Sequence, residues 1–219
     1  MLFDHYCPTQ RQPNRPSAYS YTNVHFCCEC RANLLAHLHR LKTDSYQIDQ
    51  KQIIKAVGYC LKKKDDFGRE VVKETLLSLA KDDKLSDIII RTAIIGFTNF
   101  PELKPFIFAE WIPSVIRKLS WKDTVKKSVF DGLVLLLKNH STHAAAKEML
   151  KCFLSLPLTR LSEATTSAPE ASKSLLELFA SMSSSEKTSI LSGVYVGLTL
   201  DEEEVSNKER LVTKLQPTV

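Results

Sequence analysis

LSDIIIRTAIIGF, residues 85–97, decides the fold class, because this run is apolar over most of a helical circumference. Its isoleucines would also suit a β-strand, since β-branched side chains pack well on a pleated sheet. The length of the run and the helical spacing of the apolar residues around it favour a helix packed between neighbouring helices. We therefore expect an all-α protein.

The same helical spacing continues on both sides of this run. Apolar residues recur three or four positions apart, which is the period of one face of a helix. The expected faces are Leu34, Leu35 and Leu38; Ile53, Ile54, Val57 and Leu61; Val72, Leu76 and Leu79; Val125, Val129, Leu133 and Leu136; Met149, Leu150, Phe153 and Leu154; Leu175, Leu178, Phe179 and Met182; and Ile190, Leu191, Val194 and Leu198. Short amphipathic helices cannot bury such faces alone and must stack on their neighbours. The pattern predicts stacked antiparallel helices in a HEAT-like or α-solenoid arrangement, although no strict repeat period is visible.

Prolines and capping residues mark the expected helix ends. Asp49–Gln52 and Ser183–Glu186 have the capping-box pattern of a helix start. Proline removes a backbone donor and clashes in a helix interior, but it fits the first turn. We expect a break at Asn99–Pro101, a helix entered near Pro105, and a kink or restart at Pro113.

The chain divides into three parts by composition. Residues 1–24 are rich in Pro, Gln, Asn, Ser and Tyr without an apolar period, which indicates a flexible leader. Residues 25–200 carry the helical pattern and form one predicted domain. Residues 201–219 form a charged tail, expected as either a short docked helix or a frayed end.

Composition limits the classes of function. The 219 residues are 43% hydrophobic, enough for one sizeable core or an array of small helical units. The net charge of +5 permits contact with RNA without requiring it. No apolar run reaches the ~18 residues of a membrane span, and the N-terminus does not have the pattern of a secretory signal. The six cysteines are therefore expected as reduced thiols in the nucleus or cytoplasm, with no membrane partner.

Cysteine and histidine pairs suggest metal sites without completing one. Cys27 and Cys30 have the spacing with which two thiolates bind zinc, but a second such pair is missing, and His5 with Cys7 fits no zinc module. We interpret the cysteines as ordinary thiols at a helix start. His37 and His39 would point about 200° apart on a helix, so we interpret both as surface residues.

A Ser/His pair is the remaining catalytic candidate. Ser141 lies between His140 and His143, but no glycine motif for an oxyanion hole accompanies them, and the glycines of the chain form no phosphate loop. The sequence therefore predicts no catalytic residue, no metal and no cofactor.

Two groups of residues are candidates for partner binding. Large aromatic residues crowd the proline junction, and lysines surround a tryptophan just after it. The candidate residues are Phe106, Phe108, Trp111, Trp121, Lys122, Lys126 and Lys127. Aromatic residues anchor many interfaces, and lysines attract RNA or acidic peptides. A core role for the aromatic rings and a solvated helix face for the lysines are the alternatives.

The junction Phe100–Phe106, FPELKPF, resembles the C-terminal region of the symplekin family. The likeness extends in order over residues 50–198. Its other landmarks are Lys73–Leu79, Ile90–Ala93, Trp121, Val129–Gly132, Leu154–Pro157 and Ala168–Glu170. They are packing and turn residues rather than a catalytic signature.

This resemblance implies a nuclear scaffold without an active site. Its partners would be the C-terminal portions of the endonuclease subunit of the cleavage and polyadenylation specificity factor and of its inactive paralogue. Symplekins are much longer and carry an N-terminal HEAT domain that binds a phosphatase. Nothing in this sequence matches that domain, so phosphatase binding is not implied.

Two functions from different classes follow. The first is a protein-binding scaffold in pre-mRNA 3′-end processing. The second is a helical-repeat module that binds RNA through the lysine-rich segment. Zinc-assisted hydrolysis is the weakest interpretation, because it requires a bound metal.

Overall fold

A computed structural model describes residues 27–41, 49–119 and 126–215, and every regular element in these ranges is a helix. The α-helices are α1 (Cys28–Arg40), α3 (Gln50–Lys62), α4 (Arg69–Ala80), α5 (Ile89–Asn99), α6 (Lys104–Phe106), α7 (Ile112–Lys118), α8 (Lys127–His140), α9 (Lys147–Leu154), α10 (Leu158–Ser167), α11 (Ser172–Ser181), α12 (Ser184–Leu191) and α13 (Glu202–Thr213). Short 3-10 turns are η1 (Pro101–Leu103), η3 (Ala144–Ala146), η4 (Pro169–Ala171) and η5 (Val194–Val196), and η2 (Ile107–Trp111) is a π-helical turn. The all-α prediction is confirmed. The predicted leader, residues 1–24, lies outside the described ranges.

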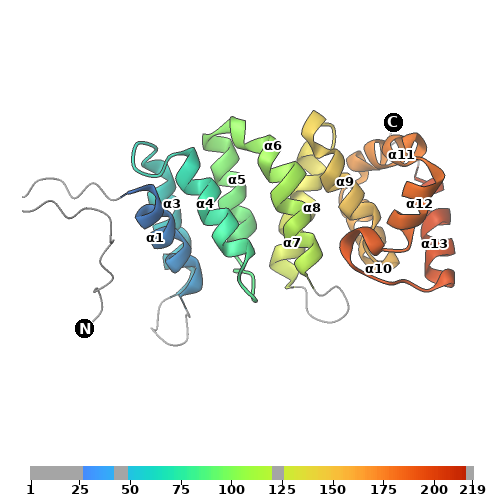
Figure 1. Cartoon of the computed structure of the whole chain (residues 1–219), viewed down its shortest axis with the longest axis horizontal. Coiled ribbons are helices and arrows are strands. Elements are labelled where there is room, and N and C mark those ends of the chain that lie inside the picture. Colours follow the sequence, from blue (N-terminus) through green and yellow to red (C-terminus); the bar gives the residue numbers. More distant parts are fainter. Residues whose placement is uncertain (1–26, 42–48, 120–125, 216–219) are drawn as a thin grey trace, which may run out of the picture.

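The helices stack side by side along the long axis of the molecule (Figure 1). Helices α1 and α3 form one end, and α11, α12 and α13 form the other. Contacts follow the order of the chain: α1 packs on α3 and α4, α5 on α3, α4 and α8, and α9 on α7 and α11. The predicted stack is therefore confirmed, whereas a regular solenoid repeat stays a prediction.

One hydrophobic core runs through the stack. Leu76 of α4, Phe130 of α8 and Phe153 of α9 are almost completely buried and belong to the same cluster. Each helix contributes an apolar stripe that a neighbouring helix covers. This packing stabilises short helices that would not be stable in isolation.

Side-chain caps fix two helix starts as the sequence predicts. The Asp49 carboxylate accepts a hydrogen bond from the Lys51 N–H, and Gln52 Oε1 accepts one from the Asp49 N–H, both at 3.1 Å. Ser183 and Glu186 form the reciprocal pair at the start of α12. Such a cap stabilises a helix by about 1 kcal/mol.

The proline junction contains the predicted break and an additional π turn. Helix α5 ends at Asn99, and the chain re-enters a helix at Lys104–Phe106, as expected. The N–H of Ile112 then donates to the carbonyl of Ile107, five residues back. A proline clashes with the carbonyl four residues before it, and the wider turn ahead of Pro113 accommodates that ring.

The buried face of the first helix differs from the prediction. Leu34 is 49% exposed, and the face that packs on the core is formed by Ala32, Leu35, Ala36 and His39. The interpretation of His39 as a surface residue is therefore wrong, whereas His37 is exposed. The leucines alone do not define the buried face, because Ala32, Ala36 and His39 also recur with the helical period and lie on the face with Leu35.

The imidazole of His39 connects two segments of the stack. Its Nδ1 lies 3.2 Å from the Ser86 hydroxyl and its Nε2 lies 3.1 Å from the Thr92 hydroxyl of α5. Burial, together with the nearby Arg40, lowers its pKa to about 4, and Asp82 opposes the shift. The ring is therefore neutral in the folded chain at neutral pH.

Helix α12 ends earlier than the apolar pattern suggests. Gly193 adopts a left-handed conformation with φ of 79°, which terminates the helix after Leu191. Val194 is consequently exposed instead of continuing the buried face. The prediction of a helix that extends to Leu198 is therefore wrong.

Of the two alternatives for the charged tail, the structure shows a docked helix, α13, within residues 201–215. Helix α13 buries Val212 and Lys208, and the Lys208 ammonium donates to the carbonyl of Leu191 at 2.9 Å. Burial lowers the pKa of Lys208 to about 8, and Glu204 opposes the shift. A buried lysine thus caps the end of α12.

Two helical glycines give a matched test of the packing. A Cβ at Gly132 of α8 would lie 2.8 Å from Ile90 Cγ2 of α5, whereas a Cβ at Gly58 of α3 would meet nothing within 4 Å. We expect Gly132→Ala to lower the free energy of unfolding by about 1–3 kcal/mol, because the core is overpacked. Gly58→Ala should raise it by about 0.5–1 kcal/mol through helix propensity. Urea titrations of both variants check this pair, and equal effects would contradict the close contact between α5 and α8.

Candidate protein-interaction site

The aromatic residues of the proline junction lie in the core. Phe108 and Trp111 are at most 1% exposed, and Phe106 is 8% exposed. The indole N–H of Trp111 donates to the carbonyl of Leu76 in α4 at 2.9 Å, and the Phe108 ring stands edge-on to Phe97. The expectation that these three rings form exposed partner anchors is therefore corrected, and the core alternative holds.

Their burial follows from the position of the junction in the stack. The π turn η2 packs against α4 and α9, so neighbouring helices cover its side chains. The ammonium of Lys73 also lies 5.1 Å from the centre of the Phe106 ring. No local pattern in the sequence reveals this covering, because it depends on where the neighbouring helices lie.

The lysine group is only partly described. Trp121 and Lys122 lie outside the described residues. The Lys126 ammonium pairs with the Asp87 carboxylate at 2.7 Å, and Lys127 is exposed at the start of α8. Lys126 is thus paired within the chain, whereas Lys127 is accessible to a ligand. A basic groove around Trp121 stays a prediction.

The candidate Ser/His group has structural contacts. Ser141 is buried at the end of α8. His143 Nδ1 accepts a hydrogen bond from the Ala145 N–H at 3.1 Å and caps the next turn. The His140 ring packs edge-on against Phe97, and burial lowers its pKa, assisted by Lys104. These contacts fit packing and capping better than nucleophile activation.

The cysteine pair lies at the start of α1. Cys27 is the N-cap residue, its sulfur accepts from the Cys30 N–H at 3.3 Å, and the two sulfurs are 3.0 Å apart. Within the described ranges, no three His, Cys, Asp or Glu side chains gather in a way that could hold a metal ion. His5, Cys7 and His25 lie outside those ranges, so the interpretation as thiols stays a prediction.

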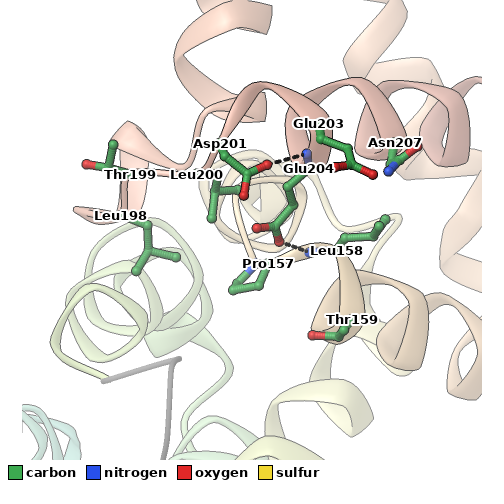
Figure 2. Close-up of a pocket in the computed structure, with 10 residues that line it drawn as sticks. All are labelled: Pro157, Leu158, Thr159, Leu198, Thr199, Leu200, Asp201, Glu203, Glu204 and Asn207. Carbon is green, nitrogen blue, oxygen red and sulfur yellow. Dashed lines mark hydrogen bonds between the residues drawn. The ribbon is translucent and has the colours of Figure 1, made fainter.

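A pocket of about 550 Å³ lies between the starts of α10 and α13 (Figure 2). Figure 2 shows that the Glu204 carboxylate accepts from the Leu158 N–H, at 2.8 Å, and that Asp201 accepts from the Glu204 N–H, at 2.7 Å. Both carboxylates therefore serve as caps for helix N-termini. They are not arranged as an acid–base pair.

A second pocket, of about 300 Å³, was not anticipated from the sequence. It lies between α1 and α3, and its rim includes the exposed side chains of Leu34 and Tyr59. The sequence does show that the lysines of α3 and Tyr59 are spaced so as to share one face of that helix. Together these features form a candidate surface for a partner.

None of the helices in the described ranges is both long and apolar enough to cross a bilayer.

Comparison with known families gives a match over more than half of the chain. The family described as "Symplekin tight junction protein C terminal" matches residues 28–168, from the first residue of α1 to the residue after α10. A search of solved structures gives no match. The matched range includes the junction Phe100–Phe106 and confirms the predicted resemblance, although it begins and ends earlier than residues 50–198. The chain therefore belongs to the symplekin C-terminal family.

Proposed function

We propose that this chain is a non-catalytic scaffold module of the nuclear machinery that cleaves and polyadenylates pre-mRNA. Its partners are the endonuclease subunit of the cleavage and polyadenylation specificity factor and its inactive paralogue. The observation that carries this proposal is the family match over residues 28–168, because the symplekin family acts as a scaffold in 3′-end processing.

The architecture supports a role through shape rather than chemistry. A continuous core connects the stacked helices, so the surface is presented on a firm support. The titratable side chains that could suggest catalysis have internal partners instead: His39 binds two hydroxyls, His143 caps a turn, and Glu204 caps a helix. A fold alone does not define a function, and these contacts favour binding over catalysis.

Binding of RNA through the lysine-rich segment is the second candidate. The exposed Lys127 at the start of α8 favours it. The ion pair between Lys126 and Asp87 weakens it, because that ammonium is already neutralised. RNA contact is therefore proposed as secondary to protein binding.

Calorimetric titration at two salt concentrations separates these candidates. The purified chain is titrated with the C-terminal portion of the endonuclease subunit, with that of the paralogue, and with oligouridylate. We expect binding of the protein segments to fall less steeply with salt than binding of oligouridylate, because a partner segment makes apolar contacts as well as ionic ones. Strong oligouridylate binding that falls steeply with salt would favour the RNA candidate, because neutralised phosphates release counterions. No hydrolytic activity is expected from the chain alone.

A further inference from the structure

The N-terminal end of the stack carries an apolar pocket at its surface. Helices α1 and α3, at that end in Figure 1, enclose a volume of about 300 Å³, the lower end of the range of ligand pockets. Leu34 comes from α1, Tyr59 and Cys60 come from α3, and Phe67 follows α3. We call this feature, together with the lysines of α3 described below, the α1–α3 groove.

Two exposed hydrophobic side chains converge on this pocket. Leu34 is 49% exposed and Tyr59 is 64% exposed. Isolated exposed apolar residues are common, but two that line one concavity are typical of a binding surface. Phe67 is buried, so the pocket has an apolar floor beneath an open rim.

A stripe of positive charge runs along α3 beside the pocket. Lys51, Lys55 and Lys62 are exposed, and they share a helical face with Tyr59. The three lysines span about 16 Å along the axis. The sequence of α3, QKQIIKAVGYCLK, contains no acidic residue, and none of the described carboxylates pairs with these lysines. This positively charged face of α3 favours an acidic ligand.

A simple polar cap would not account for this surface. The end of a helical stack needs a polar outer face for solubility, and the lysines alone would provide one. Leu34 and Tyr59 work against that purpose, because they add exposed apolar area at the same end.

The polar groups at the pocket rim favour a peptide over RNA. Tyr59 could stack on a nucleobase. The guanidinium of Arg31, however, already binds the Asp66 carboxylate at 3.3 Å and the Asp66 carbonyl at 2.9 Å. Among the lining side chains, Leu34 and Phe67 offer a base no hydrogen-bond partner, so burying its polar edges against them is costly, whereas an apolar side chain needs no such partner.

We propose that the α1–α3 groove binds an acidic segment of a partner protein. One large apolar side chain of that segment lies between Leu34 and Tyr59, and its carboxylates pair with Lys51, Lys55 and Lys62. The proposal goes beyond the assigned role, because it specifies a surface and a ligand chemistry whichever protein supplies the segment.

Fluorescence anisotropy with the full chain tests the groove. The probes are a labelled short peptide with one phenylalanine among glutamates, the same peptide with serine in place of phenylalanine, and labelled oligouridylate. We expect the phenylalanine peptide to bind about tenfold more tightly than the serine peptide, because the ring fills the pocket. Lys51→Glu with Lys55→Glu, and Tyr59→Ala alone, should each weaken binding of the phenylalanine peptide about tenfold.

A matched control uses exposed lysines elsewhere. Lys81→Glu with Lys84→Glu, in the segment between α4 and α5, makes the same change of net charge and should leave peptide binding unchanged. All substituted side chains are exposed, so melting temperatures should change little. Equal affinity for the two peptides, equal loss in both double variants, or tighter binding of oligouridylate would overturn the proposal.

Binding of both kinds of ligand to the wild-type chain separates this surface from the proposed function. If the wild-type chain binds the phenylalanine peptide but neither endonuclease nor paralogue segment, the scaffold assignment fails and the groove stands. If it binds those segments but not the peptide, the groove fails and the scaffold assignment stands.

Discussion

Replacing Trp111 by alanine should lower the free energy of unfolding by about 3–5 kcal/mol. The indole is 1% exposed and fills the space between η2 and α4, so its removal leaves a cavity in the core. It also removes the hydrogen bond that the indole N–H donates to the Leu76 carbonyl. Thermal and urea unfolding followed by circular dichroism give the change directly.

Two further variants identify the cause. Trp111→Phe keeps most of the apolar volume and loses the N–H donor, so it should cost less than the alanine variant. Leu135→Ala removes a side chain that is 47% exposed on α8 and should change stability by less than about 0.5 kcal/mol. If Trp111→Ala melted like the wild type, the ring could not be a core residue.

Lowering the pH from 6.5 to 4 should remove about 3 kcal/mol of stability through His39. Its folded-state pKa of about 4 lies below the ordinary value of 6.5, so the unfolded chain takes up the proton first. The contribution is complete above pH 6.5 and is lost as the pH falls through the folded pKa. The pKa of His140 is lowered in the same direction and adds to the slope.

A neighbouring histidine supplies the control for this pH dependence. His39→Gln should flatten the fall in unfolding free energy between pH 6.5 and pH 4, because the buried titrating ring is gone. His37→Gln, on the exposed side of the same helix, should leave the slope as in the wild type. Equal slopes for all three proteins would show that protonation of His39 is not coupled to folding.

Local signals in the sequence predict the helices and most of their ends, although the end of α12 is an exception. The capping boxes at Asp49 and Ser183, the break after Asn99 and the helix predicted from residues 85–97, which is α5 (Ile89–Asn99), all depend on residues close in sequence. The physics of a cap or of a proline acts within a few residues, so a short pattern is sufficient to reveal it.

Burial was harder to predict, because it depends on distant segments. Trp111 is covered by α4 and α9, and His39 is buried because hydroxyls at Ser86 and Thr92 satisfy its nitrogens. Lys208 is buried because the end of α12 offers it carbonyl oxygens. A periodic pattern shows which residues share a face, but it does not show which face another helix will cover.

The same limit applies to the candidate site. Phe106, Phe108 and Trp111 were candidates for anchors because large aromatic residues are common in both cores and interfaces. Only the fold separates these two roles: it buries these three rings and leaves Leu34 and Tyr59 exposed at the end of the stack. The sequence shows that Lys51, Lys55 and Lys62 share a helical face, but only the structure shows that this face lies beside a pocket.

Light scattering coupled to size exclusion tests the scaffold role most directly. The purified chain is mixed with the C-terminal portion of the endonuclease subunit, and separately with that of its inactive paralogue, after circular dichroism has established that the chain is helical. We predict that each mixture elutes as a complex with the summed mass of its two components. Separate elution of a folded chain from both partners would contradict the scaffold assignment.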